Sequence, residues 1–217
     1  MAWPAGNGRQ TQDNANYDGY ANSIYTIAVG AVNSLGQQAS YGEPGACLMV
    51  VAPSGVEGGP NERGILTTDL AGDGGQNTSA VTGDLPDRDY TQRFGGTSAV
   101  TPMVAGVSAL LLQANPNLGW RDVQEILLRS ASKVDPADAD WMTNGFGLHF
   151  NHKYGAGLVD ANAAVNLATH WINLGQQTNI FLEQTNLAEV IPDNTPAGIT
   201  RAFDLTGVAP LRVGHVT

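Results

Sequence analysis

The chain has 217 residues, of which 42% are hydrophobic and 14% charged, a composition typical of a folded protein rather than a disordered one. Its formal net charge of −10 argues against a nucleic-acid-binding surface, because few cations are present to neutralise phosphates, and favours a basic partner. The longest apolar stretch, 103–112, is interrupted by Gly106 and Ser108 and is too short for a bilayer, so we expect no membrane span.

Two short apolar runs near the start, 23–32 and 47–52, are rich in β-branched residues and are bounded by Gly, Asn and Pro. Such runs are typical of parallel strands that helices cover on both faces, and they predict two core strands, with 65–68 as a possible third. Cys47, the only cysteine, lies in the second run, where a buried structural thiol is expected. Residues 69–94 are rich in Gly, Asp, Asn, Thr and Ser without periodicity, which predicts a surface loop.

Three helices are predicted in the second half of the chain. Residues 97–114 are apolar almost all round and stop before Pro116, which indicates a buried central helix. Residues 120–131 place apolar side chains at helical spacing among charged ones, which is typical of an amphipathic surface helix. Asp160 is the predicted N-cap of a third helix that ends near Trp171.

After residue 171 the composition changes to Asn, Gln and Thr, and the stretches 200–203 and 211–216 alternate apolar and polar residues. This pattern is typical of exposed antiparallel strands, so we expect a boundary near residue 172 between domains 1–171 and 172–217. Both ends of the chain are expected to be cuts through a longer protein.

The segment 94–102, FGGTSAVTP, combines a flexible turn with the start of the apolar helix. Gly95 and Gly96 let the chain turn sharply, and Ser98 falls in the first helical turn. Unpaired N–H groups and the positive end of the helix dipole favour the oxyanion that forms when a serine adds to a carbonyl. A serine at this place also commonly caps the helix. The local pattern therefore leaves two roles open for Ser98, nucleophile or cap.

Several segments in order along the chain resemble the subtilisin family of serine endopeptidases, and especially its kexin and furin (proprotein convertase) branch. They are AGNG at 5–8, DGYANSIYTIAVGAV at 18–32, YGEPGA at 41–46, GTSAVTP at 96–102, NPNLGWRDVQEIL at 115–127 and FNHKYGAGLVDANAAV at 150–165. The resemblance covers 1–171 and implies the C-terminal half of a catalytic domain, with an α/β fold in which helices flank a parallel sheet.

The resemblance implies a catalytic role for residues at two places in the chain. Ser98 would be the nucleophile, and the side-chain amide of Asn7 and the Ser98 N–H would form the oxyanion hole. Thr97 would contact the substrate. The alternative for Asn7 is a turn-forming residue in a Gly-rich bend.

The same resemblance assigns roles to three acidic residues near the start. Asp18 would face a P1 Arg or Lys, while Asp13 and Glu43 would bind a structural calcium ion beneath the P1 pocket. The alternative is that these carboxylates are simply solvated. Ala15 and Gly45 stand where the resembling convertases form a disulfide, and the loop before the nucleophile is longer than theirs.

A serine nucleophile needs a general base, and this chain does not obviously contain one. Its histidines are His149, His152, His170 and His215. All follow Ser98, whereas the subtilisin order is Asp, then His, then Ser. We therefore expect the catalytic His and Asp to lie upstream of Met1, packing or surface roles for the histidines present, and no activity from residues 1–217 alone.

The tail from Phe181, with IPDN at 191–194, resembles the opening of the P domain (homo B domain) that follows convertase catalytic domains. That resemblance implies the start of a β-sandwich, and the alternative is another kind of β-sandwich appendage.

The leading prediction is a secreted, periplasmic or secretory-lumen serine endopeptidase that acts as a monomer on polypeptides and cleaves after basic residues. The alternative is a non-catalytic subtilisin-like pseudoprotease or binding scaffold. The sequence upstream of Met1 would decide between them, because only an enzyme needs the Asp and the His.

Overall fold

The computed structural model describes residues 1–55, 64–177 and 202. The chain divides into two units, Met1–Leu174 and Gly175–Thr217, and the fold below is that of the first unit. Apart from Ala202, the stretches expected to be strands at 200–203 and 211–216 lie outside the described residues. The tail from residue 181 that resembles a P domain also lies outside them, again apart from Ala202. The β-sandwich and the boundary near residue 172 therefore stay predictions.

A parallel sheet of three strands forms the centre of the first unit. Its strands, in spatial order, are β1 (Ala2–Pro4), β2 (Ile27–Val32) and β3 (Leu48–Pro53). The two predicted parallel strands are thus confirmed, with β2 beginning later than the apolar run that predicted it. Every residue of β2 is buried, which is why its sequence is apolar without alternation.

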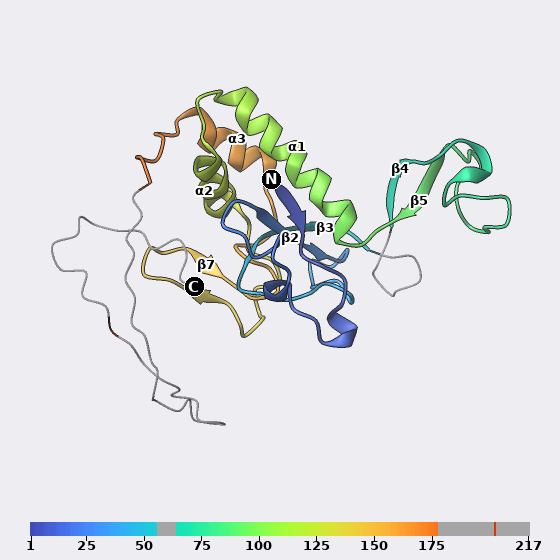
Figure 1. Ribbon diagram of the computed structural model, residues 1–217, viewed down its shortest axis with the longest axis horizontal. Coiled ribbons are helices and arrows are strands. Elements are labelled where there is room, and N and C mark those ends of the chain that lie inside the picture. Colours follow the sequence, from blue (N-terminus) through green and yellow to red (C-terminus); the bar gives the residue numbers. More distant parts are fainter. Residues whose placement is uncertain (56–63, 178–201, 203–217) are drawn as a thin grey trace. The chain divides into compact units, whose positions relative to one another are not determined.

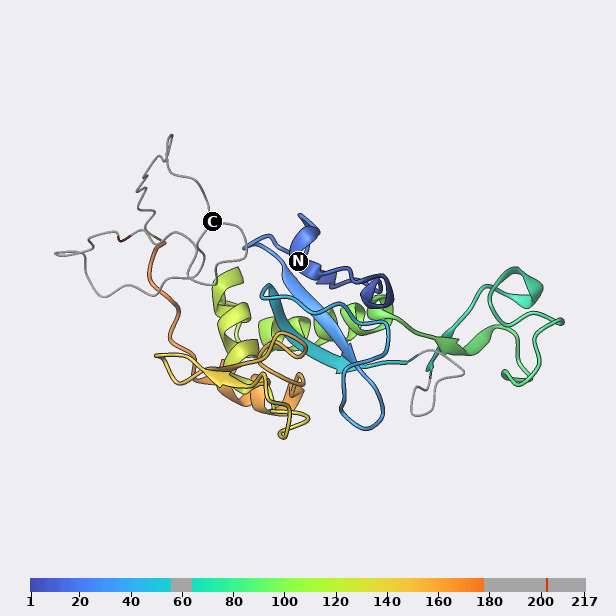
Figure 2. The ribbon, with the colours of Figure 1, turned by 90° about the horizontal axis from the view of Figure 1, so that it is seen from below.

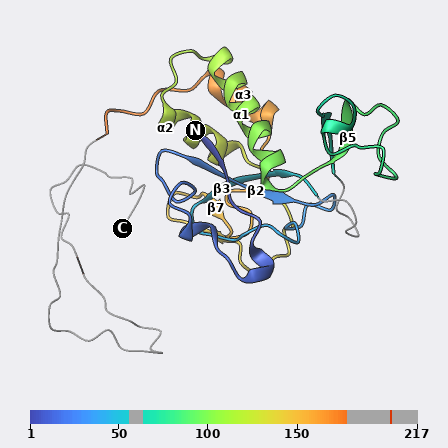
Figure 3. The ribbon, with the colours of Figure 1, turned by 45° about the vertical axis from the view of Figure 1, so that its right-hand side comes forward.

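Three helices complete the core, and they are α1 (Thr97–Ala114), α2 (Trp120–Ser130) and α3 (Ala161–Thr169). All three pack on the face of the sheet to which Val29 and Val50 belong (Figures 1 and 3). On the other face, Ala28 packs with Ala15 and Ala21, and Val51 packs with Tyr154. Both faces are covered, as the apolar runs indicate, but the described helices cover only one.

The helix boundaries agree closely with the sequence pattern. Helix α2 ends at Ser130, one residue before the predicted end, and α3 begins after its expected cap. The Asp160 carboxylate accepts a hydrogen bond of 2.9 Å from the Ala163 N–H, which satisfies one of the unpaired donors at the start of α3.

Helix α1 is only half covered by the described residues, which corrects the prediction of a buried central helix. Val100, Val104 and Leu111 face the core, whereas Leu110 and Leu112 are 46% and 44% exposed. By length and composition α1 is the one described helix that could cross a membrane. Its contacts with the three central strands and with α3 make it a core helix of this fold instead.

The segment Ile65–Thr68 is a strand, β4, but it is not part of the parallel sheet. It pairs antiparallel with β5 (Tyr90–Phe94), and both strands lie at the N-terminal end of α1 (Figure 2). The expected loop 69–94 therefore ends in a strand. The sequence did not predict β5 because the strand has no alternation of apolar and polar residues: it consists of polar and aromatic residues, and only Thr91 is buried. We call residues 64–94 the arm.

A second short antiparallel pair, β6 (Met142–Thr143) and β7 (His149–Phe150), precedes α3. After it the chain passes Gly155, whose φ of +57° and contacts explain the glycine. A Cβ at this position would lie 2.5 Å from the Met49 carbonyl oxygen, so only glycine lets the segment reach β3.

Candidate active site

The sharp turn before α1 places Ser98 in the open. Gly96 is the N-cap and has a φ of +77°, a backbone conformation that favours glycine. The buried Ser54 hydroxyl, at the end of β3, donates a hydrogen bond of 3.0 Å to the Gly96 carbonyl and holds the turn against the sheet. Ser98 follows as the second residue of α1 and is exposed.

The Ser98 hydroxyl makes no hydrogen bond with the described residues, so it does not cap the helix. Its backbone N–H is among the first four of the helix, which have no partner within the helix. A free hydroxyl and a free N–H at the positive end of the helix dipole suit a nucleophile whose product is an oxyanion.

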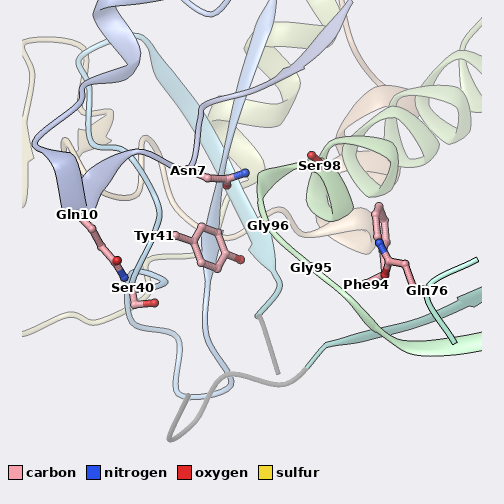
Figure 4. Close-up of a pocket in the computed structure, with 9 residues that line it drawn as sticks. All are labelled: Asn7, Gln10, Ser40, Tyr41, Gln76, Phe94, Gly95, Gly96 and Ser98. Atoms are coloured by element: carbon pink, nitrogen blue, oxygen red, sulfur yellow. The ribbon is translucent and has the colours of Figure 1, made fainter. Parts of the chain in front are cut away.

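The orientation of Asn7 is set by Thr97. The Thr97 N–H and the Thr97 hydroxyl both donate a hydrogen bond of 2.9 Å to Asn7 Oδ1. Because the oxygen is used in this way, the amide nitrogen Nδ2 turns the other way, and Figure 4 shows it on the side that faces Ser98. A Cβ on Gly96 would lie 3.1 Å from this nitrogen, so the glycine also leaves space for the amide. Asn7 thus presents a free donor beside Ser98.

Thr97 is 1% exposed, and its hydroxyl also accepts a bond of 3.3 Å from the Gly6 N–H. It does not line the cavity at Ser98. The bonds from Thr97 to Asn7 orient that amide, and the substrate contact expected for Thr97 stays a prediction.

A cavity of about 450 Å³ opens beside Asn7 and Ser98 (Figure 4). It is lined by Asn7, Gln10, Ser40, Tyr41, Gln76, Phe94, Gly95, Gly96 and Ser98. None of these is charged. The sequence pattern assigned no role to Gln10, Ser40, Tyr41, Gln76 or Phe94, because only the fold brings the turn after β1, the loop after β2 and the arm to the nucleophile.

The acidic residues near the start lie together but outside this cavity. Glu43 is buried, and its Oε1 accepts a bond of 2.7 Å from the Gly8 N–H. A Cβ on Gly8 would lie 3.0 Å from Glu43 Oε1 and 3.2 Å from Asp13 Oδ2, so the two carboxylates converge on this glycine. Burial raises the pKa of Glu43, and the charges of Asp13 and Asp18 raise it further.

This arrangement fits a hard cation such as calcium, because the carboxylate oxygens of Asp13 and Glu43 both lie close to Gly8. A cation there would also offset the repulsion that Glu43 experiences from the neighbouring negative charges. The described residues add no third His, Cys, Asp or Glu side chain to this pair. Any further ligands would have to be backbone carbonyls, water or groups outside the described residues.

Asp18 is exposed and fixed at its own loop. Its Oδ1 accepts bonds from the N–H groups of Tyr20 (2.7 Å) and Ala21 (3.3 Å). The Tyr20 bond is the main cause that lowers the pKa of Asp18, so the side chain is a carboxylate at neutral pH. Nearby, a Cβ on Gly45 would lie 3.0 Å from that of Ala15. The two positions where resembling convertases form a disulfide are therefore neighbours here.

No described histidine can act as the base for Ser98, since none lines its cavity. His149 packs its ring edge against Trp141, and His170 lies exposed at the end of α3. His152 pairs with Asp140, its Nδ1 lying 3.0 Å from Oδ2. His215 lies outside the described residues. The structural roles expected for the described three are confirmed.

Comparison with known proteins gives a consistent result. A family model described as the subtilase family matches residues 1–157. A PC3-like endoprotease, variant B, of Hydra vulgaris is 42% identical over 180 residues, which are 82% of this chain and 23% of that protein. Furin of Rattus norvegicus is 37% identical over 183 residues, which are 84% of this chain and 21% of that protein.

Among solved structures, a serine protease of Aeromonas sobria matches with a TM-score of 0.74 and 27% sequence identity, over 81% of this chain and 37% of that chain. This chain therefore spans less than a quarter of the two curated proteins named above.

Proposed function

Because this chain belongs to the subtilase family, we propose that it carries the nucleophile and the oxyanion hole of a serine endopeptidase of the furin-like type. The expected α/β fold of the family is confirmed by the Aeromonas sobria protease. The observation that carries the proposal is the pairing of an exposed, unbonded Ser98 hydroxyl with an Asn7 amide whose oxygen is tied to Thr97.

In this proposal Ser98 Oγ attacks the scissile carbonyl carbon and loses its proton to a histidine. The carbonyl oxygen becomes an oxyanion, which accepts hydrogen bonds from Asn7 Nδ2 and the Ser98 N–H. The tetrahedral intermediate then collapses, the histidine gives its proton to the leaving amine, and an acyl-enzyme remains. Water attacks this ester by the same route and frees Ser98.

The base must come from outside the described residues, since none of the described histidines reaches Ser98. We propose that a segment outside 1–217 supplies both the His and the Asp. The exposed apolar face of α1, with Leu110 and Leu112, offers a surface against which such a segment can pack.

We expect purified 1–217 to hydrolyse no peptide amide, because an unassisted serine hydroxyl is a weak nucleophile. The measurement is release of a fluorescent amine from a peptide amide, with a parallel assay of a protein that carries the proposed upstream half. Activity of 1–217 that disappears in Ser98→Ala would show that this chain holds its own base. No activity in either protein would favour the rival proposal, a subtilisin-like scaffold without catalysis.

We further propose cleavage after Arg or Lys, with the ionised Asp18 carboxylate facing the P1 side chain. The net charge of −10 would attract such substrates. Polypeptides would be cut by a monomeric enzyme in a secreted, periplasmic or secretory-lumen setting, where calcium is available.

A structural calcium ion at Asp13 and Glu43 is the remaining part of the proposal. Its role there is to neutralise two converging carboxylates and so stabilise the loop that carries Asn7.

We expect Ca²⁺ to raise the melting temperature of the protein. At a free concentration about 100 times the Kd, binding to the folded state alone adds roughly 2.7 kcal/mol to the free energy of unfolding. The calcium-dependent shift, measured by differential scanning calorimetry against a chelator, should vanish in Glu43→Gln and persist in Asp73→Asn, which removes the same charge on the arm. An unchanged shift in Glu43→Gln would contradict the site.

A further inference from the structure

The loop of the arm is held rigid by its own side chains. Asp69 Oδ2 accepts bonds from the N–H groups of Gln76 (2.7 Å) and Asn77 (2.8 Å). The Asn77 N–H is the main cause that lowers the pKa of Asp69, so this carboxylate is ionised at neutral pH and keeps its bonds. A Cβ on Gly75 would meet the Asp69 carboxylate, so a larger residue beside Gln76 would displace that side chain.

Asn77 ties the same turn to the returning half of the arm. Its side chain is 2% exposed, and Nδ2 donates to the carbonyl oxygens of Leu85 (2.9 Å), Asp87 (3.2 Å) and Tyr90 (2.8 Å). The backbone at residue 76 is therefore fixed from two sides, by Asp69 and through its neighbour Asn77. Fixed backbone position is what a residue needs to meet a ligand without a large ordering cost.

The side chain of Gln76 is exposed, and its amide makes no hydrogen bond with the described residues. It lines the cavity of Ser98 together with Phe94. Both also line a second cavity of about 260 Å³ on the arm, whose other residues are Thr67, Thr68, Asp69 and Thr91. The two cavities thus have Gln76 and Phe94 in common, and the second is lined by residues of β4 and β5. We call the two cavities together the track.

The acidic residue proposed for P1 does not line this track. Asp18 is absent from both cavities, so the P1 side chain and the track lie in different places around Ser98. The track is therefore available to a part of the substrate other than the P1 side chain. The Ser98 cavity has no charged lining, and the one charge of the second, Asp69, is used by the N–H groups of the loop.

We propose that Gln76 is a specificity-determining residue whose free amide hydrogen-bonds the peptide main chain on the leaving-group side of the scissile bond, with Asn77 as its positioning residue. The inference rests on the proposed protease function. In this inference the arm binds the part of the substrate that departs with the leaving amine. Uncharged side chains are favoured there, because the side chains that line the cavity of Ser98 carry hydroxyl, amide and aromatic groups only.

The test compares two substrates in a protein that carries the proposed base. Both have Arg at P1, but one continues for several uncharged residues beyond the scissile bond, and the other ends there in an aminocoumarin. Gln76→Ala is expected to lower kcat/KM for the extended peptide by about 3- to 10-fold, the worth of one hydrogen bond, and to leave the coumarin substrate unchanged. Asn77→Ala should give the same selective loss.

Gln92→Ala is the matched control, because Gln92 is an exposed glutamine of the same arm and lines neither cavity. It should change neither substrate. An equal effect of Gln76→Ala on both substrates, or no effect on either, overturns the inference while leaving the protease function intact. Failure of the unmodified protein to cleave both substrates overturns the protease function and the inference with it.

Discussion

Replacement of Ser98 by alanine is expected to lower kcat for peptide hydrolysis by about 10⁶-fold in a protein that carries the proposed base, which is the loss found when subtilisin loses its serine. The reason is that no acyl-enzyme can form without Oγ. The remaining oxyanion donors can then assist only the direct attack of water on the peptide carbonyl. The measurement is single-turnover hydrolysis of a peptide with Arg at P1.

Two observations separate this loss from a folding defect. The Ser98 hydroxyl is exposed and has no partner among the described residues, so Ser98→Ala should change the free energy of unfolding by no more than about 0.5 kcal/mol. Ser108→Ala, on the same helix, removes a hydroxyl that among the described residues bonds only the Val104 carbonyl, and this variant should keep full activity. Retained hydrolysis in Ser98→Ala would reject the proposed nucleophile.

Replacement of Asn7 by leucine is expected to lower kcat by about 10²- to 10³-fold with little change in KM. This range is that of the corresponding side-chain donor in subtilisin. An oxyanion donor acts mainly in the transition state, so its loss slows the chemical step without weakening substrate binding. Steady-state kinetics on the same peptide separates the two constants.

Thr97→Val provides the companion measurement for Asn7. Valine keeps the branched shape but removes the hydroxyl that donates to Asn7 Oδ1, while the backbone donor stays. A smaller loss in kcat, of about 2- to 10-fold, is expected from one missing hydrogen bond. A rise in KM at unchanged kcat in either variant would indicate substrate binding instead of oxyanion stabilisation.

The pattern of the sequence was sufficient for the elements whose burial is local in origin. Strands β2 and β3 appear in the sequence as apolar runs, α2 as apolar residues at helical spacing, and α3 through its Asp160 cap, because each of these signals lies within its own element. The position of Ser98 at the start of α1 follows in the same way from the two glycines and the apolar helix after them.

Pairing between distant segments could not be predicted in this way. Ile65–Thr68 has the composition of a core strand, yet it pairs antiparallel with Tyr90–Phe94. Asn77 and Asp84 support this pairing, since they bond the returning half of the arm at Leu85 and at Thr91 and Gln92. Side-chain bonds across a loop leave no period in the sequence.

The sequence by itself determined the family, the parallel strands, the helices and the place of the nucleophile, since motifs and periodicity are properties of neighbouring residues. The tertiary structure alone decided the orientation of the Asn7 amide, which depends on a residue 90 positions away, and the presence of Gln76 in the cavity of Ser98. A site depends on the orientation of its side chains as well as on residue types, and that orientation is set only when residues distant in the sequence come into contact.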